Sequence, residues 1–453
     1  MMIRFINRIR KKPLKQVARE NLGKNKHKKI ITREFENIDA ALSKPGRDDY
    51  KRTENALKKC FGKDFFRFDG LPGEYIDDLA SLLVSGSRNS KVDAEDYDLI
   101  LSKSVELEPG LLSLEGWKNL CHLTNKNGLF RLGGIMRNKA VDRAYQEAQP
   151  EDAASIVVTE AFKAAVDQAD FAAAERMLSR MKKTPLNIDR SEIEKFRLYF
   201  SILKGDKEEA RVLAGKYFTD NDKKYADYLK GKTVAVVGPA PTDEALMDEI
   251  DSYDLVIRIN YRGRDHLPDP KEFGTKLNVS YYNGTCINNI SKTGKYDMFN
   301  DLDFAVFKSL KYSFQKNLVA KMRGRILFPL KYYRFYGTVN MVPATLYDLV
   351  HFEAARIKLF KVNFYLSKTI YHEGYSSYKD GKINWGNLAG HNPVTQINIT
   401  RHLWKAGQIE VDNTCKNVLS LSNDQYLSGL EAIYTNGLKN DLTDTIDRSS
   451  KKY

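Results

Sequence analysis

The stretch VAVVGPAPTDEALMDEIDSYDLVIRIN, residues 234–260, decides the fold class. An apolar run of β-favouring residues leads into Gly238, and an acidic, helix-forming segment follows. A second apolar run then ends on Arg258 and Asn260. A strand, a tight turn, a helix and another strand are typical of layered α/β proteins with parallel sheets. The stretch therefore predicts an α/β fold.

The same alternation continues along the second half of the chain. Short apolar runs separated by amphipathic stretches are TVAVVG, DLVIRIN, LNVSYYNG, DFAVFKS, RILFPL and KLFKVNFYL. They predict an α/β domain over residues 229–425 with a mostly parallel sheet. The polar residues 426–453 are predicted to form a C-terminal tail.

Residues 31–228 are predicted to form an all-helical domain, because apolar residues recur there at spacings of three and four. Two segments, 161–181 and 196–218, resemble each other, with turns at Asp170 and Asp206. Their offset is close to the period of tetratricopeptide (TPR) helical hairpins. A TPR-like array and an ordinary helical bundle are both open, and either suits docking of a protein partner.

The first thirty residues carry eleven Lys or Arg against the single Glu20, within a chain of net charge +14. Two interpretations stay open for residues 1–30: a solvated tail, or a short amphipathic helix on an anionic membrane surface. The segment lacks the apolar core and cleavage site of a signal peptide. No other stretch approaches the roughly 20 apolar residues of a membrane span. We expect a cytoplasmic protein, with peripheral attachment to the inner face of the membrane if the second interpretation holds.

Composition also argues against several other classes of protein. The four cysteines, Cys60, Cys121, Cys286 and Cys415, are scattered without metal-ligand spacing, so neither a disulfide framework nor a zinc site is expected. Basic residues beyond the N-terminus are interspersed with acids, and no recognition-module motif is present, so no nucleic-acid partner is expected.

Polar residues follow the predicted strands where each one ends. In open α/β sheets, ligands bind at the carboxyl ends of the strands. Gly238 follows the first run, and its missing side chain would let the backbone approach a phosphate or ribose. Asn260 and Asn283 offer amides suited to a ribose hydroxyl or a base edge. Arg258 suits either an anionic ligand or an internal salt bridge.

As an ordered set, these segments resemble the long sialylmotif of the animal-type sialyltransferase family. The matching pieces are VAVVG (234–238), EIDSYDLVIRIN (249–260), EFGTK (272–276) and VSYYN (279–283), which together cover about fifty residues. Members of that family transfer sialic acid from CMP-sialic acid, and their long motif forms much of the nucleotide site. The resemblance implies a Rossmann-like, GT-A-variant domain and a bacterial CMP-sugar-dependent relative. It also implies a nucleotide site that includes Gly238, Pro239, Ala240, Arg258, Asn260 and Asn283.

Two later motifs of the family have partial counterparts. Pro343 and Thr345 match its short motif, with Leu346 where Gly is usual. The Thr345 hydroxyl, expected in the first turn of a helix, suits either the nucleotide or a helix cap. His391 matches the His of the family's last motif, but Gln396 replaces the Glu that usually follows.

His391 is the first candidate for a catalytic base, because imidazole can take the proton of an attacking hydroxyl near neutral pH. The alternative is a polar residue that starts a helix before Pro393. The alternative acids and bases are His372 and Glu373, near the family's third motif, which is matched poorly. His372 and Tyr371 are weaker candidates for a role against the leaving phosphate.

Departures from the family alter the expected substrate. Pro239-Ala240-Pro241 replaces the usual polar residues, and Val234 stands where the family has a disulfide cysteine. The donor sugar is therefore open among sialic acid, Kdo and related 2-ulosonic acids, all of which are activated as CMP esters. No metal is expected, since a CMP phosphate can leave with the help of basic groups and helix dipoles.

The leading hypothesis is a glycosyltransferase that moves an acidic sugar from CMP to an oligosaccharide or lipid-linked glycan acceptor, a cell-surface glycan precursor. The alternative is an inactive helical-repeat adaptor with a nucleotide-binding-like domain. Convergence of His391, Asn260 and Thr345 on one cleft would favour the enzyme. A dehydrogenase is disfavoured, because Asn260 stands where an acidic ribose-binding residue is expected.

Overall fold

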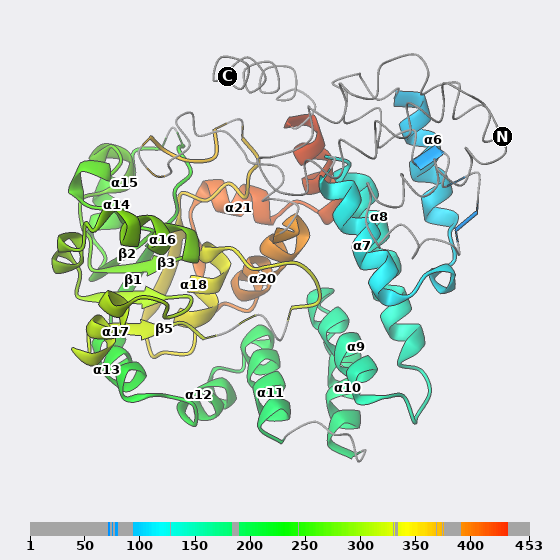
Figure 1. Cartoon of the computed structure of the whole chain (residues 1–453), viewed down its shortest axis with the longest axis horizontal. Coiled ribbons are helices and arrows are strands. Elements are labelled where there is room, and N and C mark those ends of the chain that lie inside the picture. The colour runs from blue at the N-terminus through cyan, green and yellow to red at the C-terminus, as the bar shows by residue number, and fades with distance from the viewer. Residues whose placement is uncertain are drawn as a thin grey trace. The chain divides into compact units, whose positions relative to one another are not determined.

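The computed structural model describes residues 71–72, 75, 78–79, 94–126, 128–183, 190–242, 244–328, 330, 334–367, 369–373, 375 and 391–433 (Figure 1). The basic segment 1–30 lies outside these residues, as does 434–453 of the predicted tail. Within the described part of the chain, no helix is long and apolar enough to cross a membrane.

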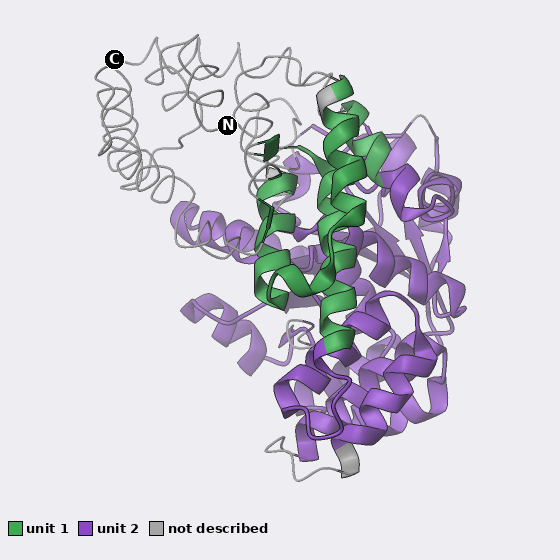
Figure 2. Ribbon diagram, turned by 90° about the vertical axis from the view of Figure 1, so that its right-hand side faces the viewer, with its two compact units in different colours: residues 1–146, 427–453 green, residues 147–426 purple. Residues whose placement is uncertain are grey.

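The chain divides into two compact units, residues 1–146 with 427–453 and residues 147–426 (Figure 2). In the described part of the first unit, the helices include α6 (Ala94–Glu106), η2 (Pro109–Leu111), α7 (Leu114–Lys126) and α8 (Phe130–Glu147), the last ending at the division. Glu431 joins the C-terminal segment to this unit: it accepts hydrogen bonds from the Tyr97 hydroxyl and the Arg131 backbone. Residues 423–433 are helical and Leu430 is buried, so this part of the predicted tail is a packed helix.

Two helical hairpins open the second unit. They are formed by α9 (Ser155–Asp167) with α10 (Phe171–Lys183), and by α11 (Arg190–Lys204) with α12 (Lys207–Gly215). Asp170 accepts a hydrogen bond from the Ala173 N–H and Asp206 from the Glu209 N–H, each at 3.0 Å, so each Asp caps the second helix of its hairpin. The expected pair of hairpins is confirmed. They belong to the same compact unit as the sheet, although we expected a domain boundary near residue 228.

Seven parallel strands form one sheet among the described residues, in the order β5-β4-β3-β2-β1-β6-β7. The strands are β1 (Thr233–Val237), β2 (Leu255–Ile259), β3 (Val279–Tyr282), β4 (Phe304–Phe307), β5 (Gly324–Ile326), β6 (Arg356–Phe360) and β7 (Glu410–Val411). The first six lie where the apolar runs predicted them. Their side chains are mostly buried on both faces, as expected for a parallel sheet covered by helices. The predicted α/β class is therefore confirmed.

Helices cover both faces of this sheet. The connecting helices are α14 (Met247–Asp251), α15 (Pro270–Phe273), α16 (Gly284–Thr293), α17 (Ser313–Ala320), α18 (Met341–Leu349), α20 (Pro393–Lys405) and α21 (Asn413–Leu419). Tyr282 packs with Ile287 of α16 on one face, whereas the Tyr281 hydroxyl reaches Asp348 of α18 on the other. The hairpins support α20, since the Asn398 amide donates to the carbonyl of Asp167 at 3.2 Å.

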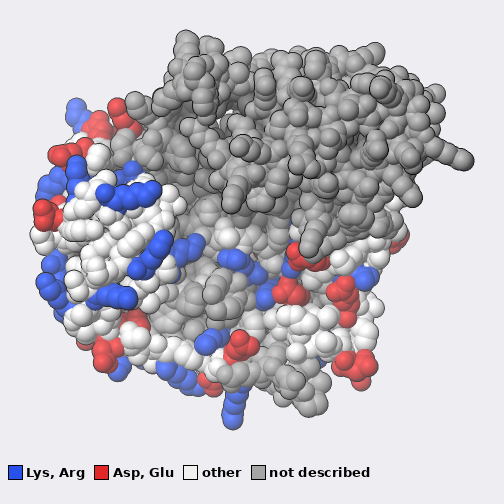
Figure 3. Space-filling view, in the orientation of Figure 1, with Lys and Arg blue, Asp and Glu red and all other residues white. Residues whose placement is uncertain are grey.

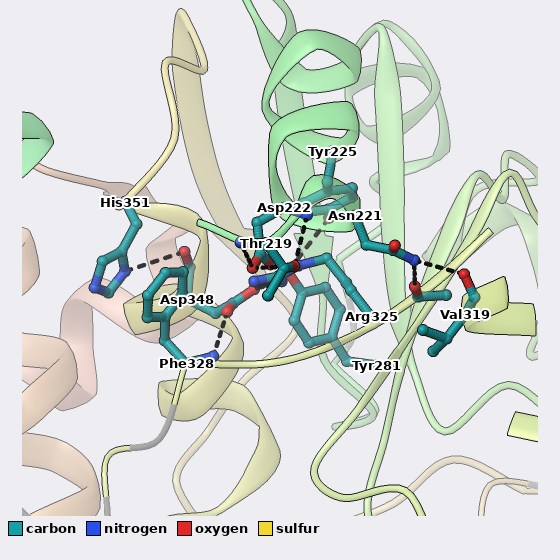
Figure 4. Close-up of polar contacts among 11 residues, drawn as sticks. Thr219, Asn221, Asp222, Tyr225, Tyr281, Val319, Arg325, Phe328, Asp348 and His351 are labelled. Carbon is teal, nitrogen blue, oxygen red and sulfur yellow. Dashed lines mark hydrogen bonds and ion pairs between the residues drawn. The ribbon is translucent and has the colours of Figure 1, made fainter. Parts of the chain in front are cut away.

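A buried guanidinium ties the sheet to the helices on the α18 face (Figure 4). Arg325 of β5 is 1% exposed and donates to Asp222 at 2.7 Å and to Asp348 at 2.5 Å. Asp222 is the third residue of α13 (Asp220–Leu229), where it forms a capping box with Thr219. One side chain thus links β5, α13 and α18.

Candidate functional site

The order of the sheet strands reverses beside β1. The chain runs outward from β1 to β5 and returns to β6 on the other side of β1, which makes the β1/β6 edge a topological switch point. Ligands of open α/β sheets bind in the crevice at such a point. Gly238 closes β1 here, and its N–H donates to the Phe360 carbonyl at 2.8 Å. A Cβ on Gly238 would lie 2.6 Å from the Lys361 carbonyl oxygen and closer still to Val362. The glycine is therefore explained by close contact with β6.

A pocket of about 630 Å³, counting space open to solvent, lies at this edge. We call it the switch-point pocket. Its lining residues are Pro239, Ala240, Ile259, Asn260, Asn283, Asn340, Met341, Val342, Pro343, Val362, Asn363, Phe364, Tyr365, Ile370, Tyr371, Tyr375 and Gln396. The lining is amide-rich and aromatic, and its described residues include no Asp, Glu, Lys or Arg. Five predicted site residues, Pro239, Ala240, Asn260, Asn283 and Pro343, therefore meet in one pocket.

Asn260 holds the wall of the pocket together. Its Oδ1 accepts from the Asn283 N–H at 3.0 Å, and its Nδ2 donates to the Tyr375 hydroxyl at 3.1 Å. Asn283 in turn caps α16, accepting from the Cys286 N–H at 2.7 Å. Both amides that we predicted at strand ends therefore lie at the pocket, and both also fix its backbone.

Unusual backbone conformations concentrate here. Seven described residues other than glycine have positive φ, and three of them, Asn260 (56°), Phe364 (48°) and Tyr365 (71°), line the pocket. Lys361 (58°) lies directly before the lining residue Val362. Such conformations cost about 1–3 kcal/mol each and cluster at ligand sites when the surrounding structure enforces them. The strain is a second indication of a binding site, independent of the pocket itself.

Tyrosines form the outer wall. The rings of Tyr371 and Tyr375 lie 4.8 Å apart between centroids at 35°. Tyr365 accepts from the Asn340 amide at 2.7 Å, which fixes the start of α18 against β6. Aromatic faces of this kind can stack on a nucleobase.

A second pocket adjoins the first, sharing Pro239, Asn260 and Tyr375 with it. We call it the histidine pocket. Its polar and basic lining includes Arg258, Arg262, His266 and His372, and Gly238 forms part of its floor. The backbone N–H of His372 donates to the Pro239 carbonyl at 2.8 Å. Burial lowers the pKa of His372, the Glu373 carbonyl opposes this, and Arg258 lowers the pKa further.

Arg258 has a mainly structural role. Its guanidinium donates to the carbonyls of Phe273 and Gly274 at 2.9 Å and of Lys276 at 3.1 Å. Asp251 accepts from the N–H groups of Thr275 and Lys276 in the same loop. The segments 251–258 and 273–276 are therefore tied together. Arg258 binds the carbonyl groups of the turn at 273–276, and Asp251 binds its N–H groups.

Thr345 is placed differently from our prediction. Helix α18 begins at Met341, with Asn340 as its N-cap, so Thr345 lies in the second turn and not the first. Its side chain is fully buried, it lines neither pocket, and its hydroxyl has no hydrogen-bond partner among the described residues. The predicted first-turn contact or cap is wrong because the helix starts earlier than the position of Pro343 suggested.

His391 precedes α20, whose N-cap is Asn392, and so does not itself cap the helix. His391 is not among the residues lining the two pockets, but it is anchored next to the first of them. Its Nδ1 lies 2.7 Å from the Thr338 hydroxyl and 3.1 Å from the Thr338 carbonyl. Two residues later, Asn340 lines the switch-point pocket.

Two groups of Thr338 contact the same nitrogen of the imidazole. A carbonyl only accepts hydrogen bonds, so the 3.1 Å contact fits a proton on Nδ1, whereas the Thr338 hydroxyl at 2.7 Å fits either tautomer. Burial lowers the pKa of His391, the Thr338 carbonyl opposes this, and the cations Lys308 and Arg334 lower the pKa further. The lowered pKa favours the neutral ring at pH 7, which is the form that a general base needs.

Gln396 organises the same corner. Its Nε2 donates to the Thr338 carbonyl at 2.7 Å and to the His391 carbonyl, while its Oε1 accepts from the Asn340 N–H at 2.7 Å. A carboxylate could accept from Asn340 but could not donate to the two carbonyls. The amide at 396 is thus explained by its contacts in this chain.

Several pocket residues were not predicted. They are Asn340, Asn363, Phe364, Tyr365, Tyr375 and Arg262. Arg262 follows Asn260 by two residues, and a strand end rich in arginine was a usable signal. Asn363 and Tyr365 lie shortly after the end of β6, and Asn260 lies directly after β2. Ligands bind at the carboxyl ends of strands, so the polar residues after the last apolar run could have been predicted as well.

Comparison of this chain with protein-family models, with curated proteins and with solved structures finds no match. No group of three His, Cys, Asp or Glu side chains suited to a metal ion occurs in the described ranges. The predicted independence from metal stays a prediction.

Proposed function

We propose that this chain is a CMP-sugar-dependent glycosyltransferase that moves an acidic 2-ulosonic sugar, such as sialic acid or Kdo, to a hydroxyl of a cell-surface glycan precursor. One observation carries the proposal. Residues from the predicted motif segments at 239–240, 260, 283 and 343 line one strained pocket at the switch point of a parallel sheet.

The composition of the pocket supports a nucleoside ligand. Amides at Asn260, Asn283 and Asn363 supply donors and acceptors suited to ribose hydroxyls and a base edge. Tyr371 and Tyr375 provide ring faces. The adjoining histidine pocket, with Arg262 and His372, supplies basic groups for a phosphate.

In the proposed reaction, His391 acts as the base and the basic groups of the histidine pocket act on the leaving phosphate. The acceptor hydroxyl oxygen bonds to C2 of the sugar while its proton passes to Nε2 of His391. The bond from C2 to the phosphate oxygen breaks, and CMP leaves with the electron pair. Arg262, His266 and His372 stabilise the charge that develops on the phosphate. In this proposal no metal takes part.

Several finer assignments belong to the same proposal. The sheet unit is a Rossmann-like domain of the GT-A-variant, sialyltransferase-like kind. The preceding helices form a TPR-like module for a protein partner, and residues 1–30 bind an anionic membrane on the cytoplasmic side. The acceptor is an oligosaccharide or lipid-linked glycan.

An inactive adaptor is the second candidate, and the burial of Thr345 away from both pockets favours it. Against it, an adaptor has no need for eight tyrosine, asparagine and glutamine side chains around strained backbone. Of the three residues chosen to separate the two hypotheses, Asn260 lines the pocket, His391 lies beside it and Thr345 does not reach it.

We predict that the full-length chain releases CMP from CMP-Kdo or from CMP-N-acetylneuraminate. Release is measured by chromatography, with UDP-glucose and GDP-mannose as control donors. CMP release that increases when a lipid-linked oligosaccharide fraction is added, together with a mass-shifted glycan, supports transfer. CMP binding without any release would instead favour the adaptor.

A further inference from the structure

Another pocket lies beside β5, the strand at one end of the sheet order. Its volume is about 1070 Å³, counting space open to solvent, and we call it the β5 pocket. Its lining comes from α11, α13, β5 and α18 and from the segments next to them, all within residues 147–426. It shares no lining residue with the switch-point pocket or the histidine pocket, so it is a separate site.

The lining of the β5 pocket is mainly apolar. Its aliphatic and phenyl side chains are Leu198, Leu310, Val319, Ile326, Leu327 and Phe328. Ile326 is 48% exposed, which is unusual for a large apolar side chain of this unit. The surface nearby is different: along the lower edge of Figure 3, where Figure 1 places α12 and α13, Lys and Arg are interspersed with Asp and Glu. An apolar pocket with a few polar groups is typical of a site for a small organic ligand.

One charged side chain of this lining keeps a donor group unused. Arg325 is 1% exposed, and it donates through Nε to Asp222 and through Nη1 to Asp348. Its Nη2 is buried and has no hydrogen-bond partner among the described residues. Both carboxylates are fixed by other contacts, since Asp222 accepts from the Thr219 N–H at 2.8 Å and Asp348 from the Phe328 N–H at 2.7 Å. Nη2 is therefore the group of Arg325 that remains for a ligand.

The aromatic rings around Arg325 do not replace the missing acceptor. The ring centroids of Tyr225, Phe328 and Phe352 lie 5.1, 5.7 and 4.9 Å from the guanidinium carbon. These rings attract the positive charge, but they carry no oxygen that could accept a hydrogen bond. Leaving a buried N–H without an acceptor is unfavourable, so an oxygen atom from outside the chain is expected at Nη2.

The charges at this position favour a neutral ligand. Arg325 is paired with two carboxylates, those of Asp222 and Asp348, so the buried group as a whole is negative and would repel an anion. Lys195 also lines the pocket, but its Nζ lies 5.4 Å from the centroid of the Tyr217 ring and interacts with that ring. A carbonyl oxygen can accept from Nη2 without adding negative charge.

We propose that the β5 pocket binds a neutral, largely apolar organic molecule whose carbonyl oxygen accepts a hydrogen bond from Nη2 of Arg325. The site is separate from the proposed nucleotide site and does not depend on the transferase function. Because Arg325 links β5, α13 and α18, a ligand bound to it also stabilises these three elements against one another.

The test uses the full-length chain and ligand-observed NMR titration with three compounds that share one ring system. They are 9-fluorenone, which has a carbonyl group, fluorene, which has none, and fluorene-9-carboxylate, which is an anion. We expect 9-fluorenone to bind at least about tenfold more tightly than either of the others, because only it is a neutral acceptor.

Variants of the half-exposed Ile326 locate the binding. Ile326→Asn makes this part of the lining polar and Ile326→Trp enlarges it, and each should weaken 9-fluorenone binding by about fivefold. Val212→Asn is the matched control, since Val212 is a 55% exposed aliphatic residue of α12 that does not line the pocket. It should leave 9-fluorenone binding unchanged.

Each outcome has a defined meaning. Equal binding of fluorene and 9-fluorenone would remove the role of Arg325 as donor, and tighter binding of the carboxylate would overturn the neutral class. An equal loss in Val212→Asn, or displacement of 9-fluorenone by CMP, would show that the compound binds elsewhere. Absence of 9-fluorenone binding would mean that the pocket holds water only, and would overturn the proposal. The expected pattern in a chain that does not respond to CMP would support this site and remove only the proposed transferase function.

Discussion

Replacing His391 by Asn is expected to reduce turnover by about 10²–10⁴-fold while CMP affinity stays unchanged. The Asn amide can donate to the Thr338 carbonyl, which Nδ1 contacts at 3.1 Å in the wild type. It has no basic nitrogen in the place of Nε2, so only proton removal is lost. The measurement is steady-state CMP release, with CMP affinity determined separately by titration.

The pH dependence gives an independent readout of the same role. A base must be neutral, so turnover should rise with pH through a midpoint below 6.5, the ordinary value, because the pKa of His391 is lowered. Lys308→Gln removes one of the cations that lower this pKa, and the acid limb should move to higher pH. Equal turnover in His391→Asn and wild type would remove His391 from the chemistry. An unchanged acid limb in Lys308→Gln would argue that another group titrates.

Replacing Arg325 by Met is expected to lower the free energy of unfolding by about 3–5 kcal/mol. Asp222 and Asp348 would be left as buried carboxylates without their cation, at 9% and 0% exposure (Figure 4). Burial alone would lower the pKa of Arg325, but Asp348 and Tyr281 reverse the shift, so the guanidinium stays charged. Equilibrium urea unfolding followed by circular dichroism measures the loss.

Two comparisons make this result specific. Arg356→Met breaks an ion pair with Glu410 that is about half exposed, and should cost less than about 1 kcal/mol. Adding Asp222→Asn and Asp348→Asn to Arg325→Met removes the uncompensated charge and should recover part of the stability. A loss in Arg325→Met no larger than that in Arg356→Met would mean that the buried network does not hold β5 to the helices.

The strands and their order along the chain could be predicted because the signal is local. Each of the six apolar runs from TVAVVG to KLFKVNFYL is long enough and β-branched or aromatic enough to identify a strand. Strand β7 was missed, since it has only two residues, Glu410 and Val411. Asp170 and Asp206 revealed the hairpins because an N-cap is a local feature as well.

The roles of single polar residues were harder to predict because they depend on distant partners. Arg258 bonds to carbonyls fifteen to eighteen residues later in the chain, which periodicity does not reveal. The position of Thr345 depended on a helix start two residues before Pro343. The sequence alone does not explain why Gln396 replaces Glu. The reason is its contacts, because its amide donates to the carbonyls of Thr338 and His391 and a carboxylate could not.

The most direct measurement of the central claim is a thermal-shift titration of the full-length chain with CMP beside CDP, UMP, GDP and NAD. The proposal predicts stabilisation by CMP above all, since a ligand at 100 times its Kd adds about 2.7 kcal/mol to the stability of the folded state. Tyr371→Ala, which removes one ring of the pocket wall, should weaken the response. No response to any cytidine nucleotide, or an equal response to all five compounds, would contradict a CMP site at the switch point.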